Sequence, residues 1–86
     1  MAKIEIYTKG FCGFCARAKA LLDRKGAAFH EIDVTMDRAG FEAMVERANG
    51  GRTVPQIFID GKHVGGSDDL AALEAKGELD ALLKAA

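Results

Sequence analysis

The sequence lacks the features that would assign it to several classes of protein. It has no excess of one charge, since twelve Lys and Arg residues face thirteen Asp and Glu residues, for a formal net charge of -1. No basic block or stripe is present, so the chain shows no electrostatic basis for binding nucleic acid. No apolar run is long enough to be an export signal or to span a membrane. We therefore expect a cytoplasmic protein with neither a membrane nor a nucleic-acid partner.

Cysteine is also scarce, with two residues in a chain of 86. Small secreted domains that rely on disulfides usually carry several cysteine pairs, which close sizeable loops. Cys12 and Cys15 would close almost no loop, and a reducing cytoplasm does not favour a structural bridge. A zinc site needs about four ligands, and the other candidates, His30 and His63, have no ligand spacing to the pair. We predict no metal site of this kind and interpret both histidines as surface or strand residues.

Stretches with strand and helix patterns follow one another along the chain. Alternating or β-branched stretches predict strands, and helix-forming residues or i, i+3, i+4 spacing of apolar residues predict helices. The predicted strands are 3–7, about 28–34, 56–59 and 62–64, and the predicted helices are 14–25, about 41–48, 67–73 and a short one near 79–83. Asp60-Gly61 predicts a hairpin turn between the last two strands. Ser67 is the expected N-cap of the third helix, with Asp68 and Asp69 in its first turn.

This order is β-α-β-α-β-β-α-α, without a repeat, a low-complexity segment or a linker. One βαβ unit followed by a hairpin implies a four-stranded mixed sheet with helices on both faces. A chain of 86 residues has the size of one small domain. We therefore predict an α/β fold that forms a single domain over residues 1–86.

The two cysteines lie where the first predicted strand leads into the first predicted helix. Their spacing brings both sulfurs to one side of a helical turn, within reach of a disulfide. The N–H groups and dipole of the helix N-terminus favour a thiolate at Cys12, and Lys9 adds a positive charge. Because the thiolate is the nucleophile, we predict that Cys12 attacks a disulfide. Cys15, expected to be more buried, or an external thiol would then resolve the mixed disulfide.

Three segments resemble the signature segments of dithiol glutaredoxins, at matching separations. They are Tyr7-Thr8-Lys9-x-x-Cys12-x-x-Cys15, Thr53-Val54-Pro55-Gln56-Ile57-Phe58-Ile59 and Gly65-Gly66-Ser67-Asp68-Asp69-Leu70. The resemblance spans nearly the whole chain and is greatest to the short bacterial forms. It implies the thioredoxin fold, glutathione as reductant, and glutathionylated or disulfide-containing proteins as substrates. We expect the protein to act as a monomer.

The resemblance also implies a site for glutathione beside Cys12. Pro55 on its own marks no more than the start of a strand, where proline is tolerated. The resemblance adds a cis peptide bond between Val54 and Pro55, which turns a backbone edge outward. The N–H and C=O groups of Val54 would then pair with the cysteine residue of glutathione, and Thr53 would help to position them.

The start of the third predicted helix supplies the other half of this implied site. The N–H groups of Ser67 and Asp68 would bind the γ-glutamyl carboxylate, and the Asp68 side chain would bind the γ-glutamyl ammonium. Gly66 would let the ligand approach the backbone, and Lys9 would bind the glycine carboxylate. As plain structure the same segment is a turn followed by a helix start. We favour the interpretation as a glutathione site, because both carboxylates, the amine and the sulfur of this one ligand then have partners.

Some positions depart from the family pattern. Phe14, which would pack beside the ligand, replaces a frequent tyrosine and so keeps a ring but lacks a phenol donor. Ser67 stands where many relatives have cysteine. The second helix often offers Gln or Arg to the glycine carboxylate, whereas Phe41 and Glu42 occupy the nearby positions here. Three residues are open candidates to replace them: Arg38, Arg47 and Arg52.

Two other functions compete with this hypothesis. One is a thioredoxin-like reductant recycled by a flavoprotein reductase, but the segment Gly65-Gly66-Ser67-Asp68 would then have no evident purpose. The other is a carrier of a [2Fe–2S] cluster, which needs four thiolate ligands. Cys12 from each of two chains and two glutathione molecules would supply them. Gly13 motivates this idea, because many dithiol glutaredoxins have proline there and cluster-binding ones commonly have Gly or Ser.

Overall fold

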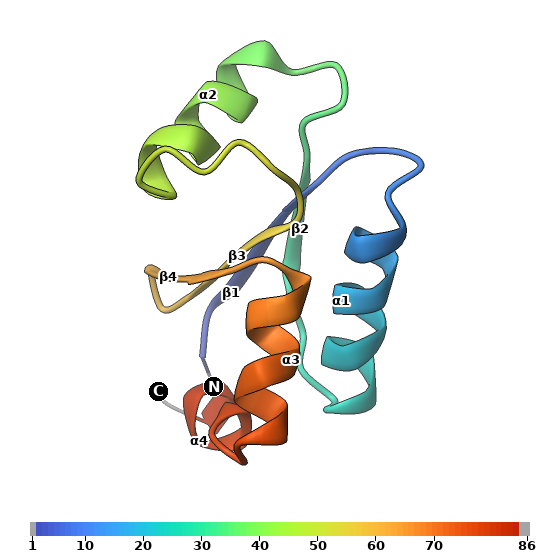
Figure 1. Cartoon of the computed structure of the whole chain (residues 1–86), viewed down its shortest axis with the longest axis vertical. Helices are drawn as coiled ribbons and strands as arrows, with labels where there is room; N and C mark the ends of the chain where they lie inside the picture. Colours follow the sequence, from blue (N-terminus) through green and yellow to red (C-terminus); the bar gives the residue numbers. More distant parts are fainter. Residues whose placement is uncertain (1, 85–86) are drawn as a thin grey trace.

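A four-stranded sheet forms the centre of the computed structural model, which describes residues 2–84 (Figure 1). The strands are β1 (Ile4–Thr8), β2 (His30–Asp33), β3 (Gln56–Ile59) and β4 (Lys62–Gly65). The helices are α1 (Gly13–Arg24), α2 (Arg38–Arg47), α3 (Ser67–Ala75) and α4 (Leu79–Lys84). The predicted order of elements is therefore confirmed.

The sheet has the order β2-β1-β3-β4 and is mixed, as the sequence predicts. β1 pairs parallel with β2, and α1 makes the crossover between them. β3 runs antiparallel to both β1 and β4. The turn between β3 and β4 consists of Asp60 and Gly61, whose φ values of 52° and 79° are both positive. Positive φ at both central residues is what a tight hairpin turn of this kind requires, so the Asp-Gly prediction is confirmed.

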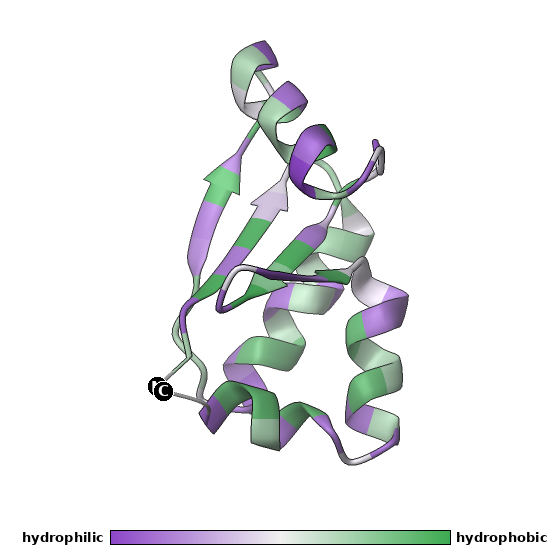
Figure 2. Cartoon of the chain, turned by 90° about the vertical axis from the view of Figure 1, so that its left-hand side faces the viewer, coloured by the Kyte–Doolittle hydropathy of each residue, from purple (hydrophilic) through white to green (hydrophobic). Residues whose placement is uncertain are grey.

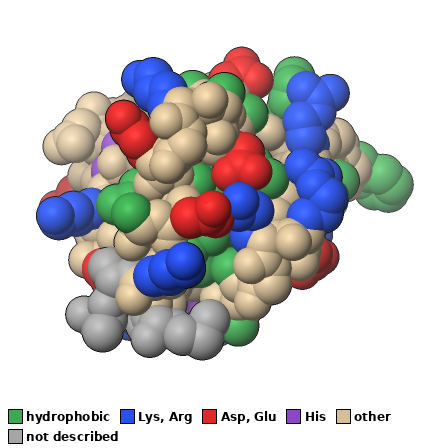
Figure 3. Space-filling view, turned by 90° about the horizontal axis from the view of Figure 1, so that it is seen from below, with side chains coloured by type: hydrophobic (Ala, Val, Ile, Leu, Met, Phe, Trp, Pro, Cys, Tyr) green, Lys and Arg blue, Asp and Glu red, His purple; other side chains and the backbone are tan. Residues whose placement is uncertain are grey.

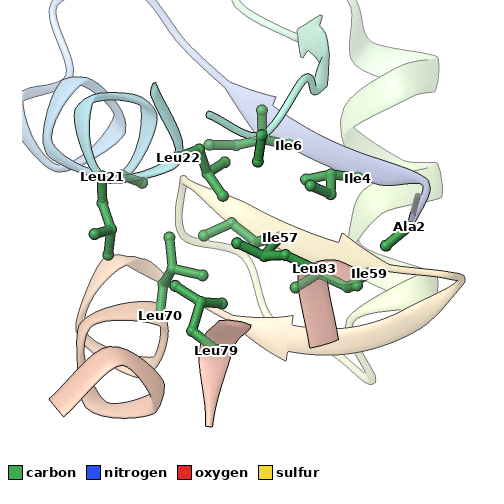
Figure 4. Packing of buried hydrophobic residues seen from close by; sticks show 12 residues of the cluster. Ala2, Ile4, Ile6, Leu21, Leu22, Ile57, Ile59, Leu70, Leu79 and Leu83 are labelled. Atoms are coloured by element: carbon green, nitrogen blue, oxygen red, sulfur yellow. The ribbon is translucent and has the colours of Figure 1, made fainter. Parts of the chain in front are cut away.

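The two faces of the sheet are covered by different helices. Successive residues of a strand point to opposite faces. Hydrophobic and hydrophilic residues alternate at the start of β1 (Figure 2), and in β3 the neighbours Ile57 and Phe58 belong to two different core clusters. Ile6 and Ile57 point to the face covered by α1, α3 and α4, where Figure 4 shows leucines of these helices around them. Those fully or nearly fully buried leucines are Leu21, Leu22, Leu70, Leu79 and Leu83. Burying each such side chain contributes about 1.5–3 kcal/mol, so this layer is the main core of the domain.

The opposite face is covered by α2 and is partly polar. Tyr7, Met44 and Phe58 are buried there. The guanidinium of Arg47 lies 4.1 Å from the centroid of the Phe58 ring and donates hydrogen bonds to the Tyr7 hydroxyl at 2.8 Å and to Glu5 at 3.0 Å. The hydrogen bonds from Arg47 lower the pKa of Glu5 below its ordinary 4.5. Arg47 therefore belongs to the packing of this face.

The start of α3 differs by one residue from the prediction. Ser67 is the first helical residue, and the N-cap is Gly66, whose backbone is extended. The Gly66 N–H donates to the Asp69 carboxylate at 2.9 Å, as in the second half of a capping box. This bond fixes the helix start one residue earlier than the Ser67 side chain would.

The surface carries both signs of charge, as the composition indicates. On the face seen from below, Lys and Arg side chains lie beside Asp and Glu side chains (Figure 3). The longest helix among residues 2–84 is α1, with 12 residues, and no helix in this range is long and apolar enough to cross a membrane.

Candidate functional site

Cys12 and Cys15 form a disulfide at the N-terminus of α1, with their Cα atoms 5.2 Å apart. Cys12 is the N-cap of the helix, with extended backbone, and its side chain is partly accessible. Cys15 lies inside the first turn and is 2% exposed. This difference confirms that Cys15 is the more buried of the two. An incoming thiol or disulfide therefore reaches Cys12 first.

The surroundings of the Cys12 sulfur favour negative charge once the disulfide is reduced. The backbone N–H of Cys15 donates to Cys12 Sγ at 3.1 Å, so a helix N–H already points at the sulfur. The first turn of α1, Gly-Phe-Cys-Ala, contains no carboxylate to oppose a thiolate. Helix N-termini and N–H donors stabilise cysteine thiolates, which are the reactive form. These contacts are of the kind that favours a thiolate at Cys12.

A cleft of about 460 Å³ lies next to this sulfur. Cys12 Sγ is 3.8 Å from the carbonyl oxygen of Val54, which lines the cleft. Most of the glutathione-binding residues implied by the resemblance come together here: Phe14, Thr53, Val54, Pro55, Gly66, Ser67 and Asp68. Four further residues complete the lining: Gln56, His63, Gly65 and Asp69. The structure therefore joins the three separate sequence segments in one place.

The loop before β3 forms one wall of the cleft. The peptide bond between Val54 and Pro55 is cis, as the resemblance implies. The Gln56 side-chain amide donates to the Thr53 carbonyl at 3.0 Å and to the Thr53 hydroxyl at 3.3 Å. His63 Nε2 lies 2.6 Å from Gln56 Oε1. Because the Gln56 NH₂ group faces acceptors on Thr53, its oxygen accepts and His63 Nε2 is the donor.

This chain of hydrogen bonds was missed by sequence reasoning, which left Gln56 without a role. His63 is an exposed residue of β4 and His30 an exposed residue of β2, so their interpretation as strand and surface residues is confirmed. A signal for the network did exist. Gln56 is a polar residue in an otherwise apolar strand, it is 5% exposed, and buried polar side chains need partners.

The turn into α3 forms the opposite wall. A Cβ atom built on Gly66 would lie 3.5 Å from the Pro55 carbonyl oxygen, so the two walls nearly touch at their base. Gly65 has a φ of 120°, and a Cβ there would collide with the Asp69 carboxyl group. Glycine is thus required at Gly65, whereas the sequence argument had singled out Gly66.

Lys9 lies apart from this cleft, in a second hollow of about 370 Å³ between the loops after β1 and β2. Its Nζ atom is 4.4 Å from the centroid of the Phe41 ring, and the Arg52 guanidinium is 5.2 Å from the same centroid. Arg38 lines this hollow as well. Arg47 is held by Glu5 and Tyr7 on the α2 face of the sheet. Of the three open arginine candidates, Arg38 and Arg52 therefore accompany Lys9.

Metal-ligating side chains do not gather in the part of the chain that the structure describes. Residues 2–84 contain no group of three or more His, Cys, Asp or Glu side chains that could hold a metal ion. A Cβ atom added at Gly13 would meet no atom within 4 Å, so packing does not demand glycine there. Cys12 is the accessible thiol that this chain could offer to a cluster.

Comparisons with known proteins agree on one family. The Glutaredoxin family model matches residues 4–64. Glutaredoxin 3 of Escherichia coli K12 is 56% identical over 84 residues, which are 98% of this chain and 100% of that protein. The solution structure of a glutaredoxin from Brucella melitensis is 56% identical, with a TM-score of 0.86, and the match covers 98% of this chain and 90% of that one. A crystal structure of a buckwheat glutaredoxin–glutathione complex is 34% identical, with a TM-score of 0.86, over 95% of this chain and 76% of that one.

Proposed function

The chain belongs to the glutaredoxin family and is a thiol–disulfide oxidoreductase, and on this premise we propose that glutathione is its reductant and binds in the cleft beside Cys12. One observation carries the proposal. The cleft is bordered at the same time by the Val54 backbone, 3.8 Å from the reactive sulfur, and by the N-terminus of α3. A ligand that has a thiol in its middle and a carboxylate at its end matches this arrangement.

Each part of glutathione has a chemical partner along the cleft. Its cysteine residue pairs with the N–H and C=O groups of Val54, as an added antiparallel strand does. Its γ-glutamyl carboxylate accepts from the N–H groups of Ser67 and Asp68 at the start of α3. Its ammonium donates to the Asp68 carboxylate. A structurally similar buckwheat glutaredoxin was crystallised as a glutathione complex, which supports this ligand.

The glycine carboxylate at the other end of glutathione meets the hollow around Phe41, where three cations outnumber the carboxylates of Asp37 and Glu42. Lys9, Arg38 and Arg52 line it, and the cations of Lys9 and Arg52 are already held over the Phe41 ring. Arg52 also forms an ion pair with Glu42 at 3.7 Å. Arg47 takes no part, since it does not line this hollow and is bonded to Glu5 on the α2 face of the sheet. Phe41 thus replaces a polar helix residue by a ring that holds two cations in place.

The reaction follows from the position of the two sulfurs. The Cys12 thiolate attacks the glutathione sulfur of a mixed disulfide, the Cys12–glutathione bond forms, and the substrate leaves as a thiolate. A second glutathione thiolate attacks this adduct, which releases oxidised glutathione and the Cys12 thiolate. With a protein disulfide, Cys12 bonds to the protein and Cys15 attacks that bond. This route leaves the Cys12–Cys15 disulfide, which is the state of the present structure and which two glutathione molecules reduce.

The same proposal indicates the compartment, the oligomeric state and the substrates of the protein. Continuous reduction by glutathione requires a reducing compartment, the cytoplasm. One chain supplies both cysteines and the whole cleft, so a monomer suffices. Its substrates are glutathionylated proteins and proteins with disulfides.

The test is to exchange the reductant. Purified protein is given a glutathione mixed disulfide or a protein disulfide, with NADPH and either glutathione plus glutathione reductase or thioredoxin reductase alone. Sustained NADPH oxidation is expected with the glutathione system. Turnover with thioredoxin reductase alone would favour the thioredoxin-like function instead.

A second, separate proposal is the [2Fe–2S] carrier, favoured only by the glycine that follows Cys12, where an added Cβ atom would meet no atom within 4 Å. This chain would contribute Cys12 and its glutathione cleft, and the remaining thiolates would come from glutathione and a second chain. Anaerobic incubation with iron, sulfide and glutathione, followed by visible absorption and size-exclusion chromatography, tests it. A coloured dimer would support the carrier function, and a colourless monomer with intact thiols would contradict it.

A further inference from the structure

Phe11, the residue directly before Cys12, is presented to solvent in an unusual way. Its side chain is fully exposed, with a relative exposure of 113%. Its φ is 56°, in the left-handed region that bulky side chains rarely adopt. Strained conformations of this kind persist where the surrounding structure enforces them, and they cluster at functional sites. Phe11 lies outside the set of residues that line the glutathione cleft.

A second exposed apolar side chain belongs to the neighbouring loop. The Gly10 N–H donates to Thr35 Oγ1 at 2.8 Å, which holds the loop between β2 and α2 against the loop that carries Phe11 (Figure 1). Thr35 is itself held by Asp33, which accepts from the Thr35 N–H at 2.8 Å. Met36 follows Thr35 and is 96% exposed. We call these two side chains the Phe11–Met36 surface.

We propose that Phe11 is a specificity-determining residue, which contacts apolar side chains next to the disulfide of a protein substrate, and that Met36 extends this contact. This inference rests on the proposed function, because it needs Cys12 to react with protein disulfides.

The position of Phe11 supports a protein substrate as its binding partner. A protein bonded to the Cys12 sulfur must pass over the residues adjacent to Cys12 in sequence and in space. Glutathione fills the cleft, where the partners are mostly backbone N–H and carboxylate groups. Phe11 lines neither this cleft nor the hollow around Phe41, whereas Met36 lies at the edge of that hollow. The two side chains offer an aromatic ring and a flexible thioether, which bind apolar side chains of varied shape.

Matched peptides test the proposal. Two synthetic peptides, each closed by one intramolecular disulfide, differ only in having Leu or Ser on either side of the attacked cysteine. Their reduction is measured with glutathione, glutathione reductase and NADPH. The mixed disulfide of glutathione and free cysteine serves as the reference substrate, because it has no chain to reach Phe11.

Three variants of Phe11 distinguish the effect of the aromatic ring from the effect of the positive φ of the backbone. Phe11→Asn removes the ring with a residue that tolerates positive φ, Phe11→Gly removes it with one that adopts positive φ freely, and Phe11→Tyr keeps it. Wild type should favour the Leu peptide by about threefold to tenfold in kcat/KM, the effect of burying one or two methylene groups. Phe11→Asn and Phe11→Gly should lose this preference and Phe11→Tyr should keep it. All should reduce the reference substrate equally.

The other outcomes overturn the inference in distinguishable ways. A wild type without preference, or a preference that survives in both ring-less variants, would show that Phe11 does not select substrates. If the ring-less variants lost as much kcat/KM on the reference substrate as on the Leu peptide, Phe11 would act on Cys12 itself. A wild-type dimer that Phe11→Gly converts to a monomer would make a second copy of the chain the occupant. Failure of wild type on the reference substrate would remove the proposed function, and this inference with it.

Discussion

The glutathione cleft and the Phe11–Met36 surface lie in the same neighbourhood of Cys12 but are built differently. The walls of the cleft are held by internal hydrogen bonds, from Gln56 to Thr53 and from Gly66 to Asp69. The Phe11–Met36 surface consists of two almost fully exposed apolar side chains on loops. One region has fixed polar groups, and the other has adaptable apolar groups.

This difference matches two kinds of recognition. Glutathione is the same molecule in every cycle, so fixed backbone groups suit it and cost little to organise. Protein substrates vary in sequence, so exposed apolar side chains on loops suit them better than directed hydrogen bonds. Mutations in the cleft should therefore affect all glutathione substrates alike, whereas mutations of the surface should affect only substrates with a polypeptide next to the disulfide.

The largest effect should come from the cysteines, which serve both regions. Cys12→Ser should abolish activity on every substrate, because it removes the nucleophile. Cys15→Ser should retain most of the activity on glutathione mixed disulfides, since external glutathione resolves the Cys12 adduct, but should lose the reduction of protein disulfides. Steady-state assays with both substrate types check this. Equal loss in both variants on the glutathione substrate would show that the roles are assigned wrongly.

A change in the cleft alone comes next. Asp68→Ala removes the acceptor for the γ-glutamyl ammonium, and a charge-assisted hydrogen bond of this kind corresponds to roughly tenfold or more in affinity. We expect KM to rise by about this factor for glutathione mixed disulfides. Asp23→Ala, on the exposed side of α1, is the matched control and should change nothing. If Asp68→Ala slowed a small disulfide without glutathione just as much, Asp68 would not act by binding glutathione.

The hydrogen bonds that link His63, Gln56 and Thr53 should matter less, so their loss should give a smaller rise in KM. Gln56→Leu removes the amide that holds the Thr53 carbonyl, and we expect KM for glutathione mixed disulfides to rise about threefold. His63→Ala removes the donor to Gln56 together with the ring that packs on Phe58, but leaves the bonds from Gln56 to Thr53, and should cost less. Activity on a small disulfide that lacks glutathione should stay unchanged in both variants. If kcat fell and KM did not, the network would act on the chemistry at Cys12 rather than on the position of the ligand.

The smallest effect on activity should come from the ion pair of Glu5 and Arg47 on the opposite face of the sheet, since neither residue lines the cleft or the hollow around Phe41. Because Arg47 lowers the pKa of Glu5, the ionised carboxylate stabilises the folded state fully above pH 4.5, and this contribution is lost as the pH falls below 4.5. Glu5→Gln should therefore lower the free energy of unfolding by about 1 kcal/mol at neutral pH. Urea denaturation should show this difference shrinking below pH 4.5, with activity unaffected. A difference that is constant with pH would place the effect in packing rather than in charge.

Local patterns were sufficient to predict much of this molecule. The alternation in β1, the run Gln56–Ile59 after Pro55, the Asp60-Gly61 turn and the cysteine spacing each depend on a few neighbouring residues, and the structure confirms them. The boundaries were less accurate, because capping contacts decide them. α2 begins at Arg38, before the apolar pattern that starts at Phe41, since the Asp37 side chain accepts from the Gly40 N–H.

Contacts between distant segments could not be predicted from the sequence. The separation of Lys9 from the main cleft depends on where Phe41 packs, and the exclusion of Arg47 depends on its reaching Glu5 across the sheet. The bond from Gln56 to His63 joins two strands: the polar residue in an apolar strand indicates that Gln56 needs a partner, but not which one. Most residues of the three motifs thus lie together as expected, with Lys9 as the exception, whereas contacts that depend on packing were missed.

The most direct test of the central claim is to observe where glutathione lies when it is bonded to Cys12. Cys15→Ser protein is trapped as the mixed disulfide with isotope-labelled glutathione, and intermolecular nuclear Overhauser effects are measured. We expect contacts from the glutathione cysteine residue to Val54 and from the γ-glutamyl group to Ser67 and Asp68. Contacts from these two parts of glutathione to Phe11 in their place would contradict the proposed site.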